Sequence, residues 1–193
     1  MDLTEGTIEQ KTGRAKINMM WFAMISMVMT FAGLTSAYIV SKSRADWVSE
    51  FKFPSAFFYS LAIIILSSIC FHLMKKAIID NKRKLATIML IATCVSGVMF
   101  VWLQLKGFGQ IVDQGFYPTG SESTIVTSFI YAIVFVHLLH IAGGLIVLLV
   151  VAINHFMGKY TKNNYLGLKL AGMYWHFVDV LWVYLFCFLY FMR

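Results

Sequence analysis

The sequence predicts an all-α membrane protein, a bundle of five transmembrane helices that forms a single domain over residues 1–193. Composition is the first reason: 60% of the residues are hydrophobic, 16% are aromatic and only 13% are charged. A soluble fold could not cover that much apolar surface. The second reason is the presence of five apolar runs of span length, and the third is the placement of Lys and Arg between them.

The five runs are each long enough to cross about 30 Å of hydrocarbon. We expect spans at about 17–40, 54–74, 85–105, 124–153 and 170–192. The first four contain no Asp, Glu, Lys or Arg. Pro54 suits the first turn of the second helix, where a missing N–H costs nothing. No cleavable signal peptide is expected, because the first run has full span length and no small-residue cleavage site follows it.

The basic residues predict the orientation. Eleven of the 16 Lys and Arg residues lie before the first span, between the second and third, or between the fourth and fifth. Lys162 belongs to this group, whereas Arg193 belongs to the smaller group on the opposite side. The excess places the N-terminus in the cytoplasm and the C-terminus outside. It also accounts for the net charge of +7 without a nucleic acid partner.

The last span carries the most unusual polar residues. Asp179 is the only acidic residue inside any of the five runs, and such a residue costs about 2.5–3.5 kcal/mol at the middle of a membrane helix. At about 100° per residue, Trp175, His176, Asp179 and Trp182 fall within about a third of the helix circumference. This face is therefore predicted to contact protein rather than lipid.

The fourth span adds His137 and His140, which share a helix face. One hypothesis is metal or haem ligation, with His176 as the ligand from the neighbouring helix. The alternative is hydrogen bonding to other helices, to Asp179 or to lipid head groups. Because the last two spans run antiparallel, a His140–Asp179 or His176–Asp179 pair is feasible. Three cysteines in separate spans are interpreted as small buried hydrophobes: Cys70, Cys94 and Cys187.

The motifs of the last two spans resemble a known family. Residues 174–182 read YWHFVDVLW, which resembles the W-H-F-V-D-x-x-W of the terminal helix in subunit III of haem-copper cytochrome oxidases. His137, His140 and Gly144 are similar to that subunit's H-G-x-H-x-x-x-G, with Leu138 in place of the first glycine. Weaker similarities lie in the third span at Gly97, Phe100 and Gln104, and in the first span from Phe31 to Tyr38. Five spans correspond to the shorter bacterial form of the subunit.

Three departures from the family pattern stand out. Met27 occupies the position of a buried glutamate in the first span, so the lipid or proton-uptake role of that carboxylate does not carry over. Lys106 and Gly107 stand where the family has an acidic residue after the third-span glutamine. Val134 and Phe135 replace a Thr-Gly pair.

The resemblance implies an accessory subunit of an aerobic terminal oxidase, cytochrome c oxidase rather than quinol oxidase, in the bacterial inner membrane. Such a subunit has no catalytic site of its own and binds neither haem nor copper, which belong to the partner catalytic subunits. It packs on subunit I, binds phospholipid and sustains proton uptake. The motif residues would be structural or lipid-contacting: His137, His140, Gly144, Trp175, His176, Asp179 and Trp182.

Two other functions remain open from the sequence. One is a haem b-binding membrane anchor of a quinone-linked respiratory enzyme, with the histidines as ligands. The other is a small transporter or assembly factor. Transport by this chain alone has little support, because no series of acidic residues runs through several spans.

Overall fold

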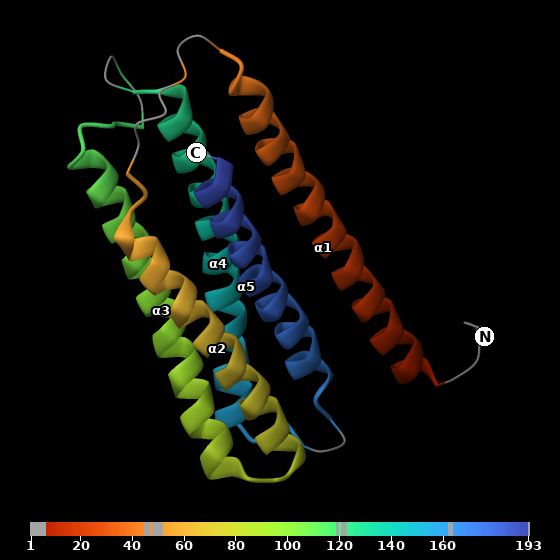
Figure 1. Ribbon diagram of the computed structural model, residues 1–193. Helices are drawn as coiled ribbons and strands as arrows, with labels where there is room; N and C mark the ends of the chain where they lie inside the picture. Colours follow the sequence, from red (N-terminus) through yellow and green to blue (C-terminus); the bar gives the residue numbers. More distant parts are fainter. Residues whose placement is uncertain are drawn as a thin grey trace.

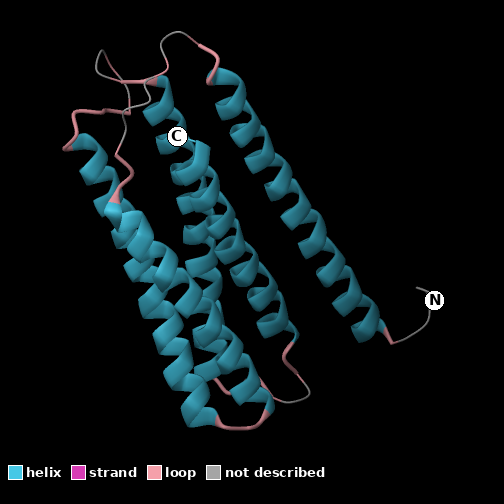
Figure 2. Ribbon diagram, viewed as in Figure 1, coloured by secondary structure: helices cyan, strands magenta, loops and turns pink. Residues whose placement is uncertain are grey.

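The computed structural model describes residues 7–44, 47, 52–118, 120, 123–161 and 164–192. These residues form five α-helices joined by loops and turns (Figures 1 and 2). The helices are α1 (Ile8–Ser41), α2 (Ser55–Ile79), α3 (Arg83–Val112), α4 (Ile125–Phe156) and α5 (Leu166–Met192). All five are long and apolar enough to cross a membrane, which confirms the predicted all-α membrane class.

Each helix covers one predicted span, with α2 and α4 beginning one residue later than expected, and all five extend beyond it at one end or both. The 34 residues of α1 begin at Ile8, because Thr7 caps the helix reciprocally with Gln10. The Thr7 hydroxyl accepts from Gln10 N, and Thr7 N donates to the Gln10 side chain. Thr124 and Thr127 cap α4 in the same way. Pro54 is the N-cap of α2, so its predicted place inside the first turn is wrong by one residue.

The helices alternate in direction, so the connections fall at the two ends of the bundle (Figure 1). We call the end where α1 begins and where α2 turns into α3 the amino end. The opposite end carries the last turn of α5. This alternation agrees with the predicted topology, but which end faces the cytoplasm stays a prediction. Two residues used to orient the chain, Lys162 and Arg193, lie outside the described residues.

Helices α2 to α5 form a compact group, with α1 at its side. α5 contacts α1, α2 and α4, and α3 joins α2 to α4. Among the described helices α1 contacts only α4 and α5, and near its N-terminus Gly13 lies beside Leu166 at the start of α5. Four α1 residues are buried, Met24, Phe31, Thr35 and Tyr38. The motif residues of the last two spans therefore belong to the α2–α5 group, where α5 has the largest buried share of the five described helices.

Candidate functional site

Trp175 joins four helices at the centre of the bundle. Its indole is 1% exposed, and its Nε1–H donates to Ser67 Oγ of α2 at 3.1 Å. A methyl group added to Gly144 of α4 would lie 3.0 Å from this ring, and one added to Gly97 of α3 would lie 3.0 Å from its other edge. Two glycines thus make the space that the α5 tryptophan fills, as small residues do at membrane helix interfaces.

Trp182 lies two turns further along the same face of α5 and stacks on His137. The ring centroids are 5.2 Å apart with an interplanar angle of 24°. Phe100 and Phe31 close the site. Each forms a T-shaped contact with the His137 ring, at centroid distances of 5.9 and 6.2 Å. Both ring nitrogens of His137 and Nε1 of Trp182 are buried without a hydrogen-bond partner among the described residues.

The His140 side chain contacts the backbone of its own helix, and the His140 backbone forms a hydrogen bond with α5. Its Nδ1 lies 2.7 Å from the carbonyl oxygen of Val136. The His140 carbonyl in turn accepts a hydrogen bond from the Tyr174 hydroxyl at 2.8 Å. The two predicted histidines of α4 therefore have different surroundings, because His137 is fully buried while His140 is partly exposed.

His176 faces α2 rather than α4. Its Nδ1 lies 2.6 Å from the Ser68 hydroxyl, and the rings of Phe71 and His72 lie 5.6 and 6.5 Å away. Asp179, one turn further along α5, is 3% exposed. The Ser68 side chain is close enough to interact with the Asp179 carboxyl.

The hypothesis of a His140–Asp179 or His176–Asp179 pair is wrong for this structure. Neither carboxyl oxygen of Asp179 has a hydrogen-bond partner among the described residues. The physical reason is the orientation of the two rings. His140 directs Nδ1 at the Val136 carbonyl of its own helix, and His176 directs Nδ1 at Ser68 of α2, so neither ring is aligned on the Asp179 carboxyl.

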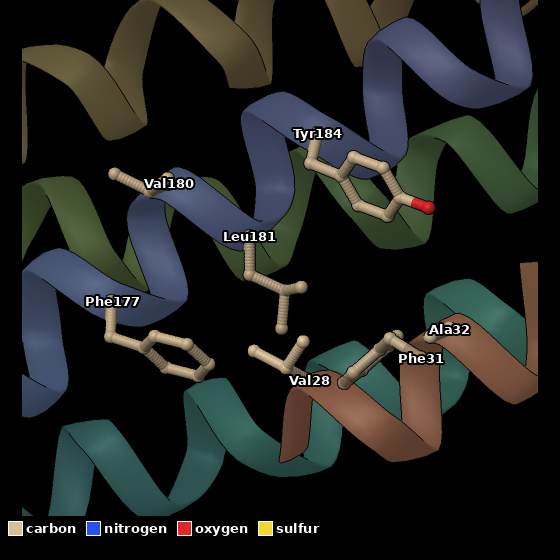
Figure 3. A pocket seen from close by; sticks show the side chains of 7 residues that line it. All are labelled: Val28, Phe31, Ala32, Phe177, Val180, Leu181 and Tyr184. Carbon is tan, nitrogen blue, oxygen red and sulfur yellow. The ribbon is translucent and has the colours of Figure 1, made fainter. Parts of the chain in front are cut away.

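An apolar groove runs between α1 and α5 beside this site (Figure 3). Its volume is about 350 Å³. Phe31 lines the groove and also contacts the rings of both α4 histidines. Met27 immediately precedes the lining residue Val28. The lining residues are Val28, Phe31, Ala32, Phe177, Val180, Leu181 and Tyr184.

Sequence reasoning missed the serines of α2 and the glutamine of α3 as partners. Ser67 and Ser68 bind the two α5 motif residues, and Gln104 donates through Nε2 to Ser60 at 2.9 Å. The only available signal was the placement of two adjacent serines within an apolar run. Within the described ranges, no three His, Cys, Asp or Glu side chains gather as a metal site would require.

Comparison with known proteins identifies the family. The sequence matches the family described as cytochrome c oxidase subunit III over residues 14–193. The chain belongs to this family. A subunit 3 of cytochrome c oxidase from Alkalihalophilus pseudofirmus is 29% identical over 163 residues, which cover 84% of this chain and 76% of the relative. A probable quinol oxidase subunit 3 from Staphylococcus saprophyticus is 25% identical over 190 residues, covering 93% and 91%.

A third relative is also named as a subunit of a quinol oxidase. The cytochrome bo(3) ubiquinol oxidase subunit 3 from Buchnera aphidicola is 27% identical over 176 residues, covering 88% of both chains. As a subunit III, the chain is a multi-pass protein of a terminal oxidase complex that also contains subunit I. Subunit III is not the haem- and copper-bearing subunit, so family membership decides against the haem b anchor. Relatives named for cytochrome c and for quinol both match, so they leave the donor unresolved.

Proposed function

We propose that this chain is a non-catalytic subunit of an aerobic terminal oxidase in the bacterial inner membrane. It packs on catalytic subunit I, stabilises the complex and sustains proton uptake during oxygen reduction. The family match over residues 14–193 carries this proposal. The site supports it, because His137, Trp175 and Trp182 are enclosed by neighbouring helices and serve helix packing.

We further propose that a phospholipid acyl chain occupies the groove between α1 and α5. The seven lining side chains are apolar apart from the Tyr184 hydroxyl, which bonds to Thr35 within the protein. An apolar groove of this kind accepts a hydrocarbon chain without leaving a polar group unpaired. His140 and Tyr174 lie near this region but are tied to the backbone of α4.

Cytochrome c is the proposed electron donor. The family description names cytochrome c oxidase, and the Alkalihalophilus relative carries the same name. The tagged complex should oxidise reduced cytochrome c and leave ubiquinol untouched in oxygen-consumption assays. Oxidation of ubiquinol without cytochrome c would assign the chain to a quinol oxidase instead.

Deletion of the chain tests the accessory role. The remaining oxidase should retain its haem spectrum and its initial rate, and it should lose activity progressively during sustained turnover. The control is the same strain with the chain supplied from a plasmid. An oxidase that lacks its haem bands from the outset would contradict the proposal, because the chain would then be needed for cofactor insertion or for the catalytic centre.

A further inference from the structure

Two adjacent serines of α2 serve two different residues of α5. Ser67 accepts the indole N–H of Trp175 at 3.1 Å, whereas the Ser68 hydroxyl lies 2.6 Å from Nδ1 of His176. His176 and Asp179 are three residues apart and share one face of α5. Ser68 is therefore the α2 hydroxyl available to both of these polar side chains, while Ser67 is committed to the tryptophan.

The Asp179 carboxyl needs a proton or a partner. It is 3% exposed, and its two oxygens have no hydrogen-bond partner within the described ranges. An ionised carboxylate in apolar surroundings is so costly that the group takes up a proton instead. The Ser68 side chain is close to this carboxyl but makes no hydrogen bond with it in the structure.

The polar series continues from His176 toward the amino end. The ring of His72 lies 6.5 Å from that of His176 and is exposed at the surface of α2. Ser68, His72 and Lys75 recur at intervals of four and three residues, so they share a helix face. Lys75 lies about 6 Å along the axis from the last residue of α2. A single bridging water can link polar groups that are too far apart for a direct hydrogen bond.

We propose that Asp179 is a proton-binding site that exchanges its proton with water at the amino end of the bundle through Ser68, His176 and His72. One proton is transferred and no bond between heavy atoms changes. A hydronium ion beside His72 gives its extra proton to Nε2 of His176 and becomes water, and the proton on Nδ1 passes to Ser68 Oγ. The hydroxyl proton of Ser68 then passes to the Asp179 carboxylate, which leaves His176 neutral with its proton on Nε2. Proton exchange with the solvent runs these transfers backward and then forward again, so each group returns to its starting state.

The surroundings of this path favour a neutral His176 between transfers. Its ring is half-buried and packs against the Phe71 ring at a centroid distance of 5.6 Å, so a positive charge on it would be poorly solvated. A neutral imidazole with its proton on Nδ1 donates to Ser68 and leaves Nε2 free as an acceptor. This arrangement involves α2 and α5 alone, so it holds for either electron donor of the oxidase.

Infrared spectroscopy of the purified oxidase complex tests the proposal. Cells are grown with aspartate that carries carbon-13 in its side-chain carboxyl, and Asp179→Asn identifies the protonated carboxyl band of this residue. The rate at which the band shifts after transfer to D₂O measures proton exchange. Ser68→Ala and His176→Gln should each slow this exchange by about tenfold or more, which corresponds to about 1.4 kcal/mol in the barrier.

Ser67→Ala is the matched control, because it removes the neighbouring hydroxyl and also loosens an α2–α5 hydrogen bond. Its exchange rate should equal that of the wild-type complex. His176→Gln keeps a donor for Ser68 but cannot relay a proton, so it separates transfer from packing if Ser68→Ala fails to assemble. The proposal is overturned if Asp179→Asn removes no protonated carboxyl band. It is equally overturned if Ser68→Ala and His176→Gln exchange as fast as Ser67→Ala.

Discussion

Substitution of Gly144 by alanine should disturb the central tryptophan. The new methyl group would lie 3.0 and 3.1 Å from two atoms of the Trp175 ring and 3.3 Å from Tyr174. Trp175 has little room to move away, because Gly97 lies against its other edge and Ser67 accepts its N–H. Overpacking of this kind costs about 1–3 kcal/mol, while alanine regains up to about 1 kcal/mol of helix propensity.

The expected net effect is a loss of about 1–2 kcal/mol, which lowers the melting temperature by about 2–8 °C in a chain of this size. The assay follows the thermal aggregation of a fluorescent fusion by size-exclusion chromatography in mild detergent. Gly33→Ala is the matched control, since a methyl group there meets nothing within 4 Å. If the Gly144→Ala variant has the same melting temperature as the Gly33→Ala variant, the tight packing of Trp175 between α3 and α4 is refuted.

Three further predictions concern other contacts. Gly107→Ala should destabilise the protein more than Gly144→Ala in the same melting assay, because its methyl group would overlap the buried Phe57 ring. Thr87→Val removes the 2.9 Å hydrogen bond to His155 and should cost about 0.5–1.5 kcal/mol, seen as a lower melting temperature. Thr7→Ala removes the capping box of α1 and should cost about 0.5–2 kcal/mol of local helix stability. Hydrogen exchange at Gln10 and Lys11 should rise while the melting temperature stays unchanged, because this turn is exposed.

The five membrane helices could be predicted from the sequence, because an uninterrupted run of about 20 apolar residues rarely forms anything but a membrane-spanning helix. Their ends could not be predicted as well. The extension of α1 back to Ile8 depends on the Thr7–Gln10 cap, a local signal in a polar segment that hydropathy does not report. The contacts of α1 were also not predictable, because both faces of a membrane helix are apolar and periodicity does not separate them.

The candidate site was predictable in its residues but not in its pairs. His137, Trp175 and Trp182 are buried as a face built for protein contact requires. The partners Ser67 and Ser68 come from α2, more than 100 residues away in the chain, and no spacing in the sequence connects them to α5. The predicted histidine pairing of Asp179 was wrong because His140 bonds to Val136 within α4 and His176 bonds to Ser68 of α2 instead.

The most direct test of the accessory role is a reduced-minus-oxidised spectrum of the tagged complex before and after this chain is dissociated from it. The account predicts haem bands in the intact complex and in the catalytic remainder, and none in the isolated 22.0 kDa chain. Haem bands retained by the isolated chain would contradict it, and they would make His137, His140 and His176 candidate ligands.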